Sequence, residues 1–221
     1  NSKIVYLNLE DRIDRREKME EFYKNQSHMP ERFSAIKTDV ETFKNQYPHL
    51  ELCENMLLKR TGWINGTLGC YQSHYEILKQ NVNSDKKFLV VLEDDCIIDD
   101  VSLEKCLEFL DNNLDIDVLR INCWKETPTN PYEIPHPNKY SKFNMEQYNL
   151  RNDFYYDGGT HCCLYPVKNI NRVINYLDNE YVFQIDAVLS TNQIKSVIYH
   201  IPTKIRYTSL SSIQQKFKKI S

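Results

Sequence analysis

The sequence lacks a long apolar run and carries no large excess of charge of either sign. No apolar stretch approaches the roughly 20 residues that cross a bilayer, which predicts a soluble module without a transmembrane segment. The formal net charge is only -3, so neither a nucleic acid nor an anionic membrane surface is expected as the main partner. Internal repeats are absent too.

The chain also lacks an initiating methionine, since it begins at Asn1. We therefore expect a trimmed form or a part of a longer protein, in which targeting cannot be read. Apolar residues make up 41% of the 221 residues and charged residues 27%, as in ordinary globular proteins. This length predicts a single domain over residues 1–221 with a substantial core.

The seven cysteines show neither the spacing of a zinc site nor that of a small disulfide scaffold. Cys70, Cys96, Cys106 and Cys123 fall within apolar patterns, which suits free buried thiols. This favours a reducing compartment, and we expect the protein in the cytoplasm.

The segment that organises the sequence is the apolar run 88–92, which leads directly into Glu93, Asp94 and Asp95. Such a run is typical of a strand buried on both faces, as in a parallel sheet. Ligands of open α/β sheets bind beyond the carboxyl ends of the strands. Three acids there suit Mg²⁺ or Mn²⁺, which prefer carboxylate oxygens. The alternative is a solvated acidic turn after a buried strand.

Elsewhere, strand patterns alternate with helical ones. Strands are expected at 3–9, 31–36, 88–92 and 117–123, followed by a turn and strand within 155–166 and a last strand pair within 196–207. Helices are expected at 11–24, from Thr67 onwards, around 103–110, at 168–177 and briefly after 185. Residues 62–67 read as a loop with Thr67 as helix N-cap. This alternation predicts an α/β domain with a mostly parallel sheet.

Several polar residues admit two interpretations. Arg12, Arg15 and Arg16 at the start of a helix either bind an external anion such as a diphosphate or form a solvated face paired with nearby acids. His161, beside Gly158 and Gly159, either contacts substrate or is a structural strand histidine. His74, in mid-helix, is expected to be structural.

Two later segments carry hypotheses of their own. Asp186 is one acid among apolar residues, which indicates either a function or a helix N-cap. The proline-rich segment 125–151 is long for a loop of a compact domain, and we interpret it as a lid on the acceptor side.

These landmarks together resemble glycosyltransferase family 25, which includes bacterial lipopolysaccharide glycosyltransferases and procollagen hydroxylysine galactosyltransferases. The matching pieces fall in the family's order between about residues 3 and 213: 5–9 with the three arginines, 32–35, 66–70 with Ser73 and His74, 92–95, Gly159-Thr160, and Ile185-Asp186 with Leu189. The element Gly-Cys-x-x-Ser-His, followed by a strand and Glu-Asp-Asp, is the most specific of them.

The resemblance implies a GT-A-like, Rossmann-type fold with helices flanking the sheet, and an inverting transfer from UDP-galactose or UDP-glucose. The acceptor would be a lipopolysaccharide-type glycan or hydroxylysine of a collagen-like protein, the latter placing a parent protein in the ER lumen. Asp95, supported by Glu93, would hold Mn²⁺ on the diphosphate. The candidates for binding the donor are Asn8, Leu9, Arg12, Ala35, Ser73 and Asp94. Asp186 is the expected catalytic base, with His161 second.

Two departures from the family pattern affect these expectations. Residues 36–39 replace the family's Asp-Gly, which affects ribose contacts, and Ser211-Ser212 replaces a Ser-Asp element that supplies a metal or acceptor ligand. Two other functions remain open: a catalytically silent module that binds nucleotide sugars or glycans, and a phosphohydrolase that uses the acids for two metals.

Overall fold

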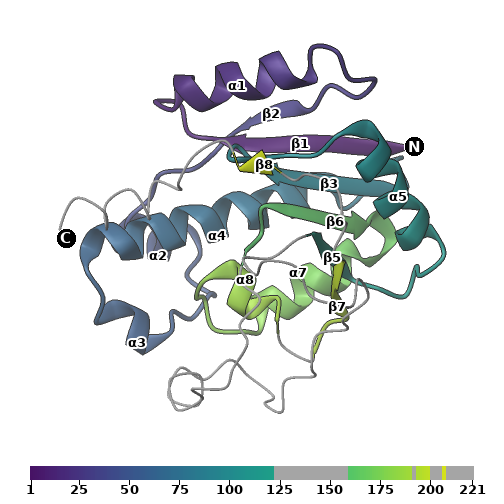
Figure 1. The fold of residues 1–221 in the computed structure, drawn as a ribbon. Coiled ribbons are helices and arrows are strands. Elements are labelled where there is room, and N and C mark those ends of the chain that lie inside the picture. The colour runs from purple at the N-terminus through teal and green to yellow at the C-terminus, as the bar shows by residue number, and fades with distance from the viewer. Residues whose placement is uncertain (122–158, 191–192, 200–205, 208–221) are drawn as a thin grey trace, which may run out of the picture.

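The computed structural model describes residues 1–121, 159–190, 193–199 and 206–207. A six-stranded sheet forms the centre, with strand order β2-β1-β3-β6-β5-β7 (Figure 1). Its strands are β1 (Ser2–Asn8), β2 (Glu31–Ser34), β3 (Phe88–Glu93), β5 (Val118–Ile121), β6 (Cys162–Pro166) and β7 (Ser196–Tyr199). The pairs β1–β2, β1–β3 and β5–β7 are parallel, and β6 is antiparallel to both of its neighbours. The predicted α/β domain with a mostly parallel sheet flanked by helices is confirmed.

Helices cover both faces of the sheet. The helices are α1 (Ile13–Tyr23), α2 (Val40–Gln46), α3 (Glu54–Leu57), α4 (Thr61–Asn81), α5 (Asp100–Asp111), α7 (Ile170–Asp178), α8 (Ile185–Val188) and the 3₁₀ turn η1 (Val167–Asn169). Alternate β3 residues divide between two cores: Leu89 and Val91 pack with residues of α2, α4 and α7, whereas Val90 and Leu92 pack with residues of α1 and α5. The run 88–92 is therefore buried on both faces, as predicted.

The start of α4 differs from the expected loop at 62–67. The helix begins at Thr61, so Thr67 lies inside it and is not an N-cap. Ile64 and Leu68 are both buried on the same side of this turn, and Trp63 packs against Phe183 with ring centroids 5.9 Å apart. This tertiary burial outweighs the cost of about 1 kcal/mol that a glycine adds to a helix.

Helix α1 carries a buried arginine on its inward face. The inward row is Arg15, Met19 and Tyr23, whereas Ile13 is 50% exposed. Arginine can occupy this row because its guanidinium has carboxylate partners across the helix–sheet interface.

The C-terminal strands do not pair with each other as expected. β7 pairs with β5, and β8 (Arg206–Tyr207) forms a separate two-stranded sheet with β4 (Cys96–Ile97). The predicted lid at 125–151, Gly158, Cys123 and Ser211-Ser212 lie outside the described residues.

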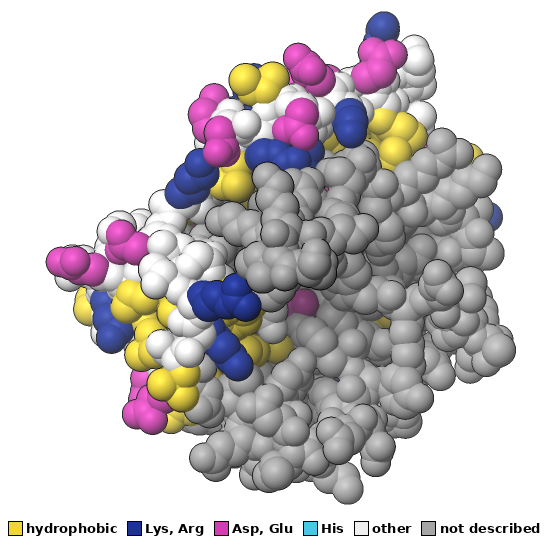
Figure 2. Space-filling view, turned by 60° about the vertical axis from the view of Figure 1, so that its left-hand side comes forward, with side chains coloured by type: hydrophobic (Ala, Val, Ile, Leu, Met, Phe, Trp, Pro, Cys, Tyr) yellow, Lys and Arg dark blue, Asp and Glu magenta, His cyan; other side chains and the backbone are white. Residues whose placement is uncertain are grey.

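The described surface carries mixed charge. Figure 2 shows acidic and basic side chains interspersed over the coloured part of one face. Among the described helices, none is both long enough and apolar enough to cross a membrane.

Candidate active site at the carboxyl end of the central strands

The direction of each strand determines which residues meet at one edge of the sheet. The carboxyl ends of β1, β2 and β3 lie there because these strands are parallel. The antiparallel β6 begins at the same edge, where the backbone N–H of Glu93 donates to the carbonyl of His161 at 2.9 Å. An antiparallel neighbour thus brings a histidine beside the acidic end of β3.

Glu93 lies between three polar side chains. Its Oε1 accepts a hydrogen bond from the Thr160 hydroxyl at 2.6 Å and lies 3.8 Å from Nε2 of His74. Its Oε2 lies 3.6 Å from Nδ1 of His161. Burial acts to raise the pKa of Glu93, but His161 and His74 together hold this pKa well below its usual range. The carboxylate is therefore ionised at neutral pH.

Asp94 turns away from that group toward α1 and β1. Its Oδ1 accepts a hydrogen bond from Nη1 of Arg15 at 2.6 Å, and its Oδ2 accepts one from the Asn8 amide at 2.8 Å. Burial raises the pKa of Asp94, and the Arg15 guanidinium opposes that rise. Arg15 is itself only 3% exposed, so this ion pair is shielded from solvent.

Asp95 lies between Arg15, which pairs with Asp94, and His161, which lies beside Glu93. One of its oxygens lies 3.3 Å from Nη1 of Arg15 and the other 3.4 Å from Nδ1 of His161. Burial opposes the charged form of His161, but Asp95 and Glu93 raise its pKa to about 10. The His161 imidazolium and the Arg15 guanidinium thus place two positive charges among three carboxylates.

The expected donor-binding residues lie along the ends of β1 and β2. The Asn8 carbonyl accepts a hydrogen bond from the backbone N–H of Ala35 at 3.0 Å, and the Leu9 carbonyl accepts one from the N–H of Arg12 at 2.9 Å. Arg12 forms a bidentate pair with Asp14. These four residues therefore lie together.

Ser73 connects α4 to this corner. Its hydroxyl accepts a hydrogen bond from the N–H of Ile36 at 2.8 Å and donates to the carbonyl of Gly69 at 2.6 Å. The helix can approach so closely because residue 69 lacks a side chain: a Cβ there would lie 2.4 Å from the Ile36 carbonyl oxygen. Ser73 thus fixes the segment that follows Ala35.

Asp186 lies near the start of α8 but is not its N-cap, because that position belongs to Gln184. Its carboxylate accepts hydrogen bonds from the backbone N–H groups of Gly159 and Ala187, at 2.8 and 2.9 Å. Gly159 has φ 117°, a conformation that glycine adopts readily. The Asp186 carbonyl in turn accepts hydrogen bonds from Ser190 and from the buried Arg120.

Two groups of side chains offer ligand atoms that all lie within 4.8 Å of one another. One is Glu93, Asp95 and His161, and the other is Cys70, His74 and Glu93. Both contain Glu93. Cys70 is also close enough to Asp186 for that charge, after burial and Glu93, to raise the pKa of its thiol. The charges of Glu93 and Asp186 thus both act on this thiol.

Three residues of this edge were not among the predicted site residues. Arg15 was expected either to bind an anion or to pair with nearby acids, and its spacing to Met19 and Tyr23 could have indicated that it faces the core. Thr160 entered only through the family resemblance and Arg120 not at all, and no local pattern indicates their partners Glu93 and Asp186, which lie 67 and 66 residues away.

Comparison with known proteins gives one family. Residues 1–210 match the model described as "Glycosyltransferase family 25 (LPS biosynthesis protein)". No curated protein matches the chain. A crystal structure of S. aureus TarS 1-349 is similar at 14% identity and a TM-score of 0.45, with 94% of this chain and 59% of that chain covered. A second S. aureus TarS structure gives 15% identity, a TM-score of 0.44, and coverage of 99% and 38%.

The present chain thus spans 59% and 38% of the lengths of these two TarS chains. The family match, in contrast, covers nearly all of the present chain and includes every residue of the edge described above. The chain belongs to glycosyltransferase family 25.

Proposed function

We propose that this chain is a metal-dependent, inverting hexosyltransferase, which moves galactose or glucose from a UDP-sugar to a hydroxyl of its acceptor. The acceptor would be a lipopolysaccharide-type glycan or hydroxylysine in a collagen-like protein. The observation that carries the proposal is the convergence of Glu93, Asp95 and His161 at the edge of the sheet where ligands bind. None of the six described cysteines forms a disulfide bond, which supports a reducing compartment such as the cytoplasm.

The chemistry of this group fits a divalent cation. Asp95 is 3% exposed, and its Oδ1 has no hydrogen-bond partner among the described residues. Two carboxylates and one imidazole suit Mn²⁺, and Glu93, Asp95 and His161 would hold it. A cation there supplies charge neutralisation to the departing diphosphate. His161 would bind as neutral imidazole, so its extra proton leaves to solvent.

The remaining residues of the edge would shape the donor site. Arg15 holds Asp94 and Asp95 in fixed orientations through short contacts. Asn8, Leu9, Arg12 and Ala35 would bracket the nucleotide beside them, and Ser73 would act by fixing the chain after Ala35. Preorganised groups of this kind need little rearrangement during the reaction.

Inversion requires a base that removes the acceptor proton from the face opposite the leaving group. Asp186 suits this role better than His161, because His161 belongs to the group that would hold the cation. The two backbone hydrogen bonds to Asp186 fix the orientation of its carboxylate. We therefore assign the base to Asp186.

The test of the cation site is calorimetric titration of UDP with and without Mn²⁺. Asp95→Ala should weaken binding in Mn²⁺ more than about tenfold and remove its dependence on the metal. Asp85→Ala, whose side chain is 85% exposed, is the matched control and should bind as the wild type. Unchanged Mn²⁺-dependent affinity in Asp95→Ala would remove Asp95 from the ligand set.

A panel of UDP-sugars with Mn²⁺, followed by thermal shift and by hydrolysis, identifies the donor. Thermal stabilisation by UDP-galactose or UDP-glucose together with slow hydrolysis supports the transferase. Binding without any hydrolysis or transfer would instead indicate a silent nucleotide-sugar-binding module.

A further inference from the structure

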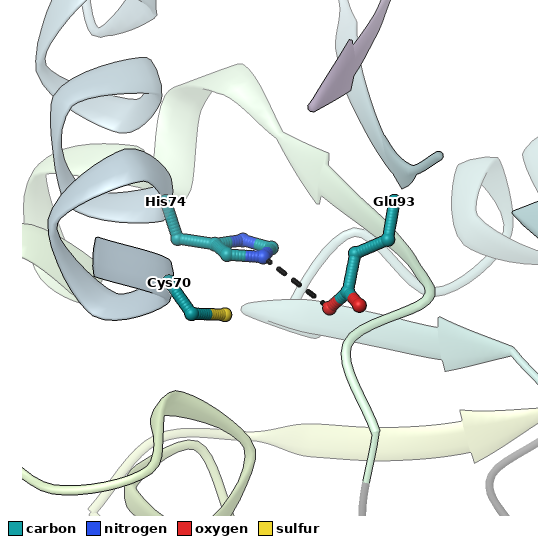
Figure 3. Close-up of side chains that lie close together, drawn as sticks. All are labelled: Cys70, His74 and Glu93. Atoms are coloured by element: carbon teal, nitrogen blue, oxygen red, sulfur yellow. Dashed lines mark ion pairs between the residues drawn. The ribbon is translucent and has the colours of Figure 1, made fainter. Parts of the chain in front are cut away.

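Cys70 and His74 stand four residues apart on α4, so they share one face of that helix. Figure 3 shows both side chains directed toward Glu93, which approaches from the end of β3. The Cys70 Sγ, a ring nitrogen of His74 and a carboxylate oxygen of Glu93 lie within 4.8 Å of one another. One thiol, one imidazole and one carboxylate are the ligand types that protein-bound zinc uses, three at a time in sites with an open fourth position.

A second observation concerns His74, which is only 1% exposed. Neither of its ring nitrogens has a hydrogen-bond partner among the described residues. The Glu93 oxygen is 3.8 Å from Nε2, which is beyond hydrogen-bonding distance. A buried imidazole without such partners costs folding free energy, and a cation between the three side chains would offset that cost.

We propose that Cys70, His74 and Glu93 form a binding site for a thiophilic divalent cation, Zn²⁺. The sulfur ligand favours zinc over manganese, which prefers oxygen. The Thr160 hydroxyl donates a hydrogen bond to Glu93 Oε1 at 2.6 Å, and Oε1 is the carboxylate oxygen on the His74 side. This hydrogen bond helps to fix the orientation of the carboxylate. When zinc binds, a Zn–S bond replaces the S–H bond of Cys70, and the proton passes to solvent.

The two groups compete for one carboxylate. Glu93 directs Oε1 toward His74 and Oε2 toward His161. Zinc bound by Cys70 and His74 would therefore also occupy the Glu93 carboxylate, which would otherwise bind the catalytic cation. Zinc concentrations that fill this site should inhibit transfer. This regulatory consequence rests on the proposed function, whereas zinc binding itself does not.

The test uses Co²⁺ as a spectroscopic probe of the purified wild-type protein. We expect one equivalent to give a thiolate-to-cobalt charge-transfer band with the visible bands of tetrahedral cobalt, and one equivalent of Zn²⁺ to abolish both. X-ray absorption of the zinc-loaded protein should show one sulfur at about 2.3 Å. A wild-type protein with no thiolate band and no sulfur neighbour overturns the proposal, whatever the variants do.

The variants identify which thiol binds. Cys70→Ser should lose the charge-transfer band and weaken Co²⁺ binding by more than about 100-fold. Loss of a residue that only supports a ligand already weakens metal binding by up to about 100-fold, and loss of a direct ligand should cost more. His74→Ala should weaken binding similarly. Cys106→Ala, a buried cysteine of α5, should keep the band. If the band survives Cys70→Ser, another thiol binds the metal and the proposal is wrong.

Asp95→Asn separates the two cation sites, since Asp95 belongs to the manganese group and not to the zinc group. This variant should retain the cobalt band with unchanged affinity, and its loss would contradict the assignment. Failure of the proposed transferase would appear as absent transfer with the band intact, so the two proposals fail in different ways.

Discussion

Arg15 and Asp94 form a buried ion pair between residues 79 positions apart, with 2.6 Å between Nη1 and Oδ1. The pair joins the first helix to the end of β3, and the same guanidinium reaches Asp95 at 3.3 Å. Removing either partner of a buried pair is costly because the other charge remains without compensation. This relationship explains why a helix with an apolar core face carries arginine on that face.

Arg15→Met should lower the free energy of unfolding by about 3–5 kcal/mol, because Asp94 and Asp95 lose a buried counter-charge. Urea denaturation followed by circular dichroism measures the change. Arg16→Met is the matched control: its partner Glu10 is 3.9 Å away and 74% exposed, so the expected loss is below about 1 kcal/mol. The double variant Arg15→Met/Asp94→Asn should recover part of the loss. Equal losses in the two single variants would contradict this account.

Gly69→Ala should also destabilise the fold, by about 1–3 kcal/mol. The added Cβ would meet the Ile36 carbonyl oxygen at 2.4 Å, so α4 and the segment after β2 must separate, and the Ser73 hydrogen bond to Ile36 weakens with them. Gly62→Ala, an exposed glycine in the first turn of the same helix, is the control and should be neutral or slightly stabilising. Thermal unfolding of both variants checks the prediction, which fails if Gly69→Ala unfolds at the wild-type temperature.

The free energy of unfolding should decrease in alkaline solution, in part because of the buried thiol of Cys106. Burial raises the pKa of this thiol to about 12, against 9.0 for a free thiol. Between these values the native state keeps a proton that the unfolded state loses, so the free energy of unfolding decreases as pH rises, by about 1.4 kcal/mol per unit. The stability of wild type relative to Cys106→Ala should therefore be constant below pH 9 and decline above it. A pH-independent difference from pH 8 to 11 would contradict the assignment.

The parts of this structure that local pattern determines were predictable. The apolar run 88–92 predicted a strand buried on both faces. The helical spacing of Leu68, Tyr71, Tyr75 and Leu78 marks the inward face of α4, and all four are buried. The glycine-containing start of α4 was wrongly predicted as a loop, because helix propensity is weak against the burial of Ile64 and Leu68.

The parts that depend on pairing between distant segments were not predictable. His161 was a candidate from its neighbours in sequence, but its position beside Glu93 depends on β6 being antiparallel to β3. The buried position of Arg15 depends on Asp94 across the helix–sheet interface. No local signal identifies which strand or acid will lie opposite.

Asp186 provides the most direct test of the chemistry. Asp186→Asn should lower kcat by about 10²–10⁴-fold, since an amide cannot take the acceptor proton, while Mn²⁺-dependent UDP affinity stays unchanged. His161→Ala should instead weaken that affinity, because His161 belongs to the group that would hold the cation. Asp115→Asn is the control: its side chain is 68% exposed and pairs with Lys195, near the amino end of β5 and so at the opposite edge of the sheet. Transfer kinetics and calorimetry on the three variants separate the roles. Near wild-type transfer by Asp186→Asn would show that another group removes the proton, and a parallel loss of UDP binding would indicate that Asp186 acts on the donor rather than on the acceptor.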